Sequence, residues 1–160
     1  MDGSLAGPRI LLRHVADEDL PAIKGWWPEA EASVRGVREP EETDFATAIG
    51  RLPVGSDVLA IVRQGDAVPI GLLVYQRRED GWLEFRWLAL AKGNRGWGYG
   101  SEAVMLVEEM GPAWRFAADV YAGNGLGLFF WLRMGYRPGR PPWKKDEATD
   151  RVTVIREQEE

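Results

Sequence analysis

The stretch that decides the fold is Arg95-Gly96-Trp97-Gly98-Tyr99-Gly100. It lies between an apolar run at 82–90 that predicts a strand and a run at 98–110 that has apolar residues at helical spacing. Its alternating glycines let the backbone approach a ligand closely. The start of a helix leaves N–H groups unpaired and carries a partial positive charge of roughly +0.5. The position between strand and helix therefore favours a pyrophosphate-binding turn over a loop that merely turns tightly.

Two other phosphate-binding motifs fit this stretch less well. A Walker loop needs a lysine before its Ser or Thr, and Gly100-Ser101 lacks one. A dinucleotide-binding turn needs Gly-x-Gly-x-x-Gly, which 96–101 does not provide, although Asp119 lies about where that fold places its ribose-binding acid. The preceding strands are joined by short turns, which predicts hairpins and disfavours a doubly wound sheet.

The rest of the chain predicts a mixed α/β domain. A helix is expected after Asp17, which could cap it, and before Pro28, which should end it. Residues 1–8 look like a loose leader, and 29–42 look like a loop or a broken helix. Strands are expected at 9–15, 57–63, 69–77, 82–90, 114–121 and 151–156, and the other helices at 43–52, 98–110 and 126–134. Residues 138–142 look like a rigid loop, and one domain is expected to span 1–160.

Composition excludes several classes of function. The 160 residues carry a net charge of −5 and contain no long basic run, which argues against nucleic acid as a partner. There is no cysteine, so thiol catalysis and cysteine-based zinc sites are excluded, and a single histidine, His14, argues against a histidine metal site. The sequence shows neither a membrane span nor a secretory signal, which predicts a cytoplasmic protein.

Two motifs carry a resemblance to the GNAT superfamily of N-acetyltransferases. Arg95 to Gly100 is similar to its Arg/Gln-x-x-Gly-x-Gly/Ala signature. Asn124, Gly127 and Gly135-Tyr136 are similar to a second family pattern. The resemblance covers about 9–156 in the order of elements and 82–136 in motifs. It implies an α/β (α+β) fold with a central mixed, mostly antiparallel sheet, flanked by helices and splayed open at the acetyl-CoA site.

The resemblance also implies where the cofactor, acetyl-CoA, would bind. Its pantetheine arm would pair with the backbone of Leu88 and Leu90 and would contact Asn124. A small residue at Gly127 leaves room for a cofactor, although close packing of the helix on the sheet explains it equally well. The pyrophosphate would lie on a turn made of Arg95, Gly96, Trp97, Gly98, Tyr99, Gly100 and Ser101. No metal is implied.

Acetyl transfer to an amine requires that a base remove a proton from it, because an alkylamine has a pKa near 10. The resemblance places two candidate bases, Asp119 on the strand at 114–121 and Glu84 on the strand at 82–90. The alternatives are that Glu84 faces solvent or pairs with Arg86, and that Asp119 is a salt-bridged strand residue.

One position departs from the family pattern. The Tyr expected seven residues after Asn124, which would protonate the leaving thiolate, is Trp131. An indole is not a usable acid, so we interpret Trp131 as a core residue and consider Tyr121 and Tyr99 as replacements. Trp26-Trp27 lies where the family builds its acceptor pocket, and core packing is the favoured role there over stacking on a cation.

The sequence therefore predicts an acetyl-CoA-dependent N-acetyltransferase that acts by direct attack of a primary amine, on a small molecule or a peptide. A domain of the same fold that binds acyl-CoA as a sensor or partner module without turnover is the main alternative. Nucleotide binding at a dinucleotide-type fold is the third. Contact with a membrane is not expected, and a homodimer is left open.

Overall fold

The computed structural model describes residues 3–37, 44–145 and 150–158. These residues form one eight-stranded sheet with the order β1-β2-β3-β4-β5-β6-β8-β7. The strands are β1 (Leu5–Ala6), β2 (Ile10–His14), β3 (Ser56–Arg63), β4 (Pro69–Arg77), β5 (Trp82–Leu90), β6 (Arg115–Tyr121), β7 (Arg137–Pro138) and β8 (Arg151–Glu157). All neighbouring pairs are antiparallel except β5 and β6.

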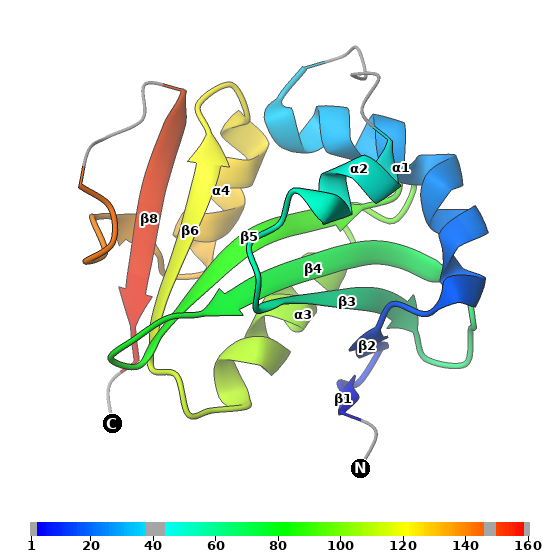
Figure 1. The fold of residues 1–160 in the computed structure, drawn as a ribbon, viewed down its shortest axis with the longest axis horizontal. Helices are drawn as coiled ribbons and strands as arrows, with labels where there is room; N and C mark the ends of the chain where they lie inside the picture. The colour runs from blue at the N-terminus through cyan, green and yellow to red at the C-terminus, as the bar shows by residue number, and fades with distance from the viewer. Residues whose placement is uncertain (1–2, 38–43, 146–149, 159–160) are drawn as a thin grey trace.

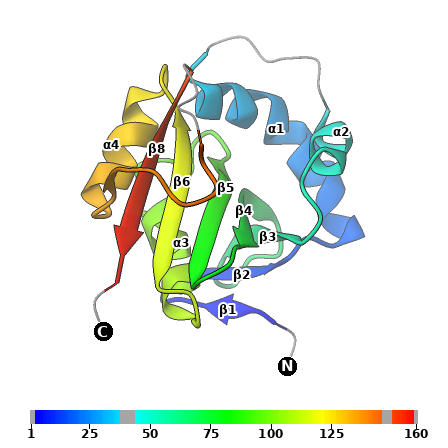
Figure 2. The same cartoon turned by 60° about the vertical axis from the view of Figure 1, so that its left-hand side comes forward.

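Helices cover both faces of the sheet (Figures 1 and 2). Helices α1 (Leu20–Arg35) and α2 (Phe45–Gly50) cover one face, where Ile23, Trp27 and Phe45 are buried against Leu72 of β4. Helices α3 (Tyr99–Glu109) and α4 (Gly125–Arg133) cover the other face and contribute to the larger core. Both helical layers therefore bury an apolar face against the same sheet.

The sheet splays open in its middle. Parallel pairing joins β5 to β6 only from Trp82–Arg115 to Phe85–Ala118, although both strands continue beyond it. The split begins at a β-bulge, because Val74 pairs with Trp87 and Tyr75 with Phe85, which leaves Arg86 without a partner on β4. A bulge re-aims the strand and its side chain. These features confirm the predicted mixed, mostly antiparallel, splayed sheet.

Several boundaries differ from the expectation. Pro28 does not end the first helix, which continues to Arg35 and stops at Gly36 in the left-handed conformation (φ 77°). Burial of Trp27 before Pro28 and of Ala30 after it continues one apolar face, and this packing outweighs the missing hydrogen bond. Residues 29–35, which were expected in a loop or a broken helix, are thus helical. Residues 38–42 of the same expected segment lie outside the described residues.

The helix starts also differ in detail. Asp17 belongs to a short 3-10 turn, η1 (Asp17–Asp19), and does not cap α1. Asp19 instead joins this turn to β2, because its carboxylate accepts bonds from Arg13 (2.6 and 2.9 Å) and from the N–H of Ala16 (2.8 Å). In α2 the carboxylate of Asp44 caps the N–H of Thr47 (2.8 Å).

The sequence patterns did not predict two short strands. Leu5–Ala6 pairs with β2 where a loose leader was expected, and Arg137–Pro138 pairs with β8 at the start of the expected rigid loop. Both lie at the edges of the sheet and are two residues long, which is too short for a periodic signal. None of the described helices is long and apolar enough to cross a membrane.

Candidate functional site

The glycine-rich turn leads directly from the end of β5 into α3. Gly96 and Gly98 both have positive φ, 81° and 85°, which favours glycine over other residues. Within the described residues, the backbone N–H groups of 96–98 donate to no protein acceptor. The N–H groups of the first turn of α3, from Tyr99 on, are unpaired by helix geometry. The turn thus presents consecutive N–H donors at a helix start, an arrangement suited to an anion.

Arg95 is already engaged by other groups. Its guanidinium donates to Glu29 of α1, at 2.9 Å to Oε2 and 2.5 Å to Oε1, and to the carbonyl of Leu90 at 3.0 Å. The hydrogen bond from Arg95 lowers the pKa of Glu29 against the opposing effect of burial. Direct contact between Arg95 and a bound phosphate would therefore require exchange of the Glu29 carboxylate.

The turn is anchored by a residue pair that the sequence patterns did not indicate. Arg9 donates from Nη1 to the carbonyl of Trp97 (2.6 Å), and its guanidinium lies 5.0 Å from the centre of the Tyr99 ring. Glu102 on α3 accepts bonds from Arg9 Nε and from the N–H groups of Arg9 and Ile10, each at 2.9 Å. Since 93 residues separate Arg9 from Glu102, no local pattern could have revealed this anchor.

We expect Glu102→Gln to loosen the turn, with a loss of about 1 kcal/mol of stability and a CoA affinity lower by about threefold. Burial raises the pKa of Glu102, but its bonds from Arg9 and Ile10 outweigh burial and lower it. The wild-type advantage in melting temperature should therefore be complete above the ordinary glutamate pKa and shrink as the pH falls through the lowered value. Glu109→Gln, an exposed change on the same helix, is the control, and an equal effect there would contradict the anchor.

The edge of β5 beyond the bulge is open toward β6. The N–H of Ala91 bonds to Ile70 of β4 (2.8 Å), so backbone groups of alternate residues point to opposite edges of the strand. Leu88 and Leu90 therefore direct their N–H and C=O groups away from β4, toward the split. The backbone of both is placed where an extended ligand could pair with it, and the Leu90 carbonyl accepts a bond from Arg95.

Asn124 has both ends of its side chain occupied. Its Oδ1 accepts from the N–H of Gly127 (2.9 Å), which caps α4, and its Nδ2 donates to the carbonyl of Val34 on α1 (3.0 Å). A Cβ at Gly127 would lie only 2.8 Å from Asn124 Cγ, so the glycine makes room for the cap. Asn124 therefore ties the start of α4 to the end of α1, and a contact with the cofactor arm stays a prediction.

Asn124→Ala should cost about 1 kcal/mol of stability, since it removes the cap of α4. The predicted cofactor contact adds a second effect, a weaker affinity for CoA in the folded variant. Thermal unfolding and calorimetric titration with CoA separate the two. If the melting temperature falls while the CoA affinity is unchanged, Asn124 only caps α4 and does not contact the cofactor.

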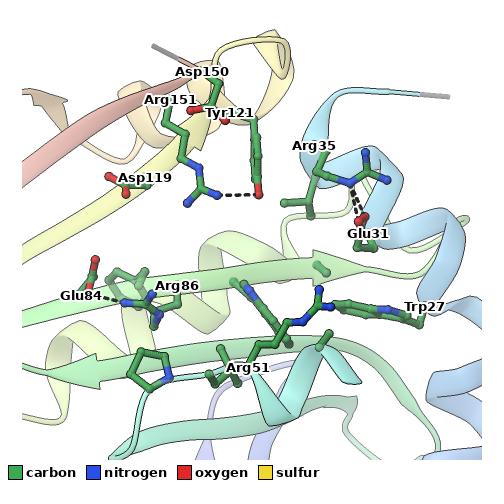
Figure 3. Close-up of a pocket in the computed structure, with 17 residues that line it drawn as sticks. Trp27, Glu31, Arg35, Arg51, Glu84, Arg86, Asp119, Tyr121, Asp150 and Arg151 are labelled. Atoms are coloured by element: carbon green, nitrogen blue, oxygen red, sulfur yellow. Dashed lines mark hydrogen bonds and ion pairs between the residues drawn. The ribbon is translucent and has the colours of Figure 1, made fainter. Parts of the chain in front are cut away.

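A cavity of about 560 Å³ lies over the split, between the strands and the helices α1 and α2 (Figure 3). Its walls come from α1, α2, β5, β6 and β8, and from residues that flank α2 and β8. The lining residues are Trp27, Glu31, Val34, Arg35, Ala48, Arg51, Leu52, Pro53, Glu84, Phe85, Arg86, Trp87, Ala89, Asp119, Tyr121, Asp150 and Arg151.

Both predicted bases, Asp119 and Glu84, face this cavity from the two strands that diverge. Thr153 donates to Asp119 Oδ1 (2.7 Å), and Lys144 forms an ion pair with Oδ2. Asp119 is thus a salt-bridged strand residue, as the alternative interpretation of the sequence held. Its carboxylate nevertheless lines the cavity.

Glu84 is more tightly held. It is 6% exposed, and its Oε1 accepts bonds from Arg78 (3.2 and 2.8 Å) and from Arg86 (2.8 Å). Three charge-assisted bonds on one oxygen occupy the lone pairs that a substrate proton would need. The pairing with Arg86 therefore occurs, and Glu84 is a weaker candidate for a base than Asp119.

Trp131, Tyr121 and Tyr99 lie in three different surroundings. Trp131 is 7% exposed and packs against Phe85 (5.3 Å) and Tyr136 (4.8 Å), so it is a core residue. Tyr121 lines the cavity, where its hydroxyl accepts from Arg151 (3.0 Å). Tyr99 instead lies under Arg9 at the turn, which leaves Tyr121 as the better placed replacement for the missing acid.

Trp26 and Trp27 have different roles in the structure. Trp26 donates to the carbonyl of Pro69 (3.1 Å). Trp27 packs against Phe45 and Trp87, with ring centres 5.3 and 5.1 Å apart, and also lines the cavity. Core packing and the wall of the pocket are therefore combined in one side chain. Among the described residues there is no cluster of His, Cys, Asp and Glu that could hold a metal ion.

Solved structures of acetyltransferases share this fold. An acetyltransferase from Agrobacterium tumefaciens is 20% identical, with a TM-score of 0.74 over 97% of this chain and 94% of that one. A GNAT family acetyltransferase from Bacillus anthracis is 16% identical, with a TM-score of 0.75 over 98% and 99%. The PaiA N-acetyltransferase of Thermoplasma acidophilum, solved with coenzyme A, is 15% identical, with a TM-score of 0.67 over 92% and 98%. No family model and no curated protein matches the sequence. The chain therefore has the GNAT fold.

Proposed function

We propose that this chain is an acetyl-CoA-dependent N-acetyltransferase that acts on a primary amine by direct attack. The observation that carries the proposal is the split between β5 and β6, which joins the open edge of β5 to a cavity lined by Asp119. The glycine-rich turn with its unpaired N–H groups lies just past the end of the same strand. The GNAT fold of the chain supports the same reaction.

The residues of the turn and of the β5 edge fit coenzyme A. Unpaired N–H groups at 96–98 and at the start of α3 would hold its pyrophosphate, with Ser101 in the same first turn. Leu88 and Leu90 would pair with the pantetheine arm. Acetyl-CoA supplies an acetyl group activated as a thioester.

In the proposed reaction, Asp119 takes the proton of the amine, directly or through a water molecule. The amine nitrogen then bonds to the acetyl carbon as the carbon–sulfur bond breaks, and the nitrogen loses its second proton, which balances the proton that the sulfur takes up. A thiol pKa near 8.5 makes the thiolate a tolerable leaving group without a dedicated acid. Tyr121 lies in the same cavity and is the residue we assign to return a proton to the sulfur.

A binding module without turnover is the second candidate function. Trp131 favours it, because a packed tryptophan stands where the family has its acid. Release of free thiol from acetyl-CoA in the presence of a panel of amines tests the two, with CoA affinity measured by calorimetry on the same sample. Amine-dependent release supports the enzyme. Tight CoA binding without release supports the module, and absence of CoA binding contradicts both.

Three further expectations stay predictions: one domain over 1–160, a cytoplasmic location, and a homodimer as an open possibility. The acceptor is proposed to be a small-molecule or peptide amine, with no role for nucleic acid or a membrane.

A further inference from the structure

The carboxylates that line the cavity are nearly all neutralised by the chain itself. Glu31 pairs with Arg35, Glu84 with Arg78 and Arg86, and Asp119 with Lys144. Such pairs cancel the charge that would otherwise attract a cation. The cavity therefore lacks the excess of negative charge that a polycationic acceptor would need, although the whole chain carries a net charge of −5.

Two arginines of the cavity have no carboxylate partner among the described residues, Arg51 and Arg151. Arg151 lies on β8, where its Nη2 donates to the Tyr121 hydroxyl (3.0 Å) and its guanidinium stacks on that ring at 4.5 Å. These contacts hold the guanidinium at the end of the cavity where Tyr121 and Asp119 lie, so Arg151 is already engaged there. Arg51 projects from the opposite wall.

The backbone of Arg51 is fixed, although its side chain has no carboxylate partner in the part of the chain that the structure describes. Arg51 is the residue that ends α2, and its N–H bonds to the carbonyls of Thr47 and Ala48, both at 3.2 Å. Figure 3 shows its side chain extending toward Trp27, across the floor of the cavity from Arg151. Asp150 is the remaining carboxylate of the lining, and it forms no ion pair with another described residue.

The two ends of the cavity differ in chemistry. Asp119 and Glu84 lie together at one end, and Arg51 reaches in from the other. Apolar side chains line part of the wall, among them Trp87, Leu52 and Pro53. An amine near Asp119 could thus extend along an apolar wall to Arg51.

We propose, resting on the function proposed above, that the acceptor is an amine that also carries an anionic group, and that Arg51 binds this group. A guanidinium suits a carboxylate or a phosphate, because its fork of N–H donors can bind two oxygens at once. The anion also has to stay away from Asp119 and Glu84, since like charges repel. The acceptor is therefore an ω-amino acid or an aminoalkyl phosphate rather than a polyamine or a neutral amine.

The test compares straight-chain ω-amino acids of increasing length with their amides, which keep the amine and lose the charge. Thiol release should show kcat/KM about tenfold higher for the acid than for its amide, at the length that spans the cavity. Aminoalkylphosphonates of the same lengths show whether the site prefers a carboxylate or a phosphate-like group.

Arg51→Gln should reduce the preference for the acid severalfold, through KM more than kcat, and leave turnover of the amides unchanged. Arg63→Gln is the matched control, because Arg63 is about half exposed, pairs with Asp66 and lies outside the cavity. Melting temperatures and CoA affinities should equal those of the wild type.

Equal use of acids and amides by the wild type would overturn the proposal of an anionic acceptor and leave the proposed acetyltransferase activity intact. Failure of every amine to release thiol would overturn the proposed function itself.

Discussion

Replacing Gly98 with valine should weaken CoA binding at least tenfold, which corresponds to about 1.4 kcal/mol. Gly98 precedes α3 with φ 85°, and its N–H belongs to the row of unpaired donors. A β-branched side chain there resists the left-handed conformation and covers the surface where an anion would meet the backbone. Its Cβ would also lie 3.0 Å from Nη2 of Arg9, the residue that anchors the turn. Calorimetric titration with CoA measures the effect.

Gly93→Val provides the matched control for the Gly98 prediction. Gly93 has a similar positive φ of 92°, and an added Cβ there meets no atom within 4 Å, so the backbone strain should cost both variants about 1–3 kcal/mol of stability. Only the Gly98 variant should also lose affinity for CoA. If both variants lose affinity equally, strain in the loop explains the result and the turn is not the anion site. Wild-type affinity in a folded Gly98→Val protein would remove the turn from the cofactor site altogether.

Local patterns were enough to predict the central strands and the turn. The strands at 57–63, 69–77 and 82–90 are short apolar runs joined by Gly- and Asp-containing turns, and each is found within a residue of its expected bounds. The glycine-rich turn could be predicted because dihedral freedom and a helix start are both properties of neighbouring residues. The split of the sheet followed only from the resemblance. Its visible cause is the bulge at Arg86, and nothing in the sequence of β5 alone marks that residue as unpaired.

The partners of the site could not be predicted, because they come from distant parts of the chain. Asp119 meets Lys144 from a loop and Thr153 from β8, and Arg9, just before β2, meets Glu102 on α3. For a related reason, the sequence pattern predicts that the first helix ends at Pro28, although it continues to Arg35. A proline penalty of about 3 kcal/mol is a local quantity, whereas the burial that outweighs it depends on tertiary packing.

The largest effect on turnover is expected at Asp119. If its carboxylate takes the amine proton, Asp119→Asn should reduce the rate by about 10²–10⁴-fold at neutral pH and leave CoA affinity nearly unchanged. The defect should be partly rescued as the pH rises toward 10, because more of the amine is then already neutral. A pH–rate profile of thiol release, recorded beside the wild type, measures both effects. Asp150→Asn, which removes another carboxylate that lines the same cavity, should retain wild-type rates.

Glu84→Gln distinguishes the two candidate bases within the same experiment. Loss of this buried carboxylate leaves Arg78 and Arg86 without their common partner, so its main cost should be stability, about 3 kcal/mol or more. Any loss of rate in Glu84→Gln should then persist at high pH, because a disturbed site is not repaired by deprotonating the substrate. If instead Glu84→Gln shows the rescue at high pH and Asp119→Asn does not, Glu84 is the base. If both variants keep wild-type rates across neutral pH, the proton goes to bulk water or to another residue, and neither carboxylate takes part in the chemistry.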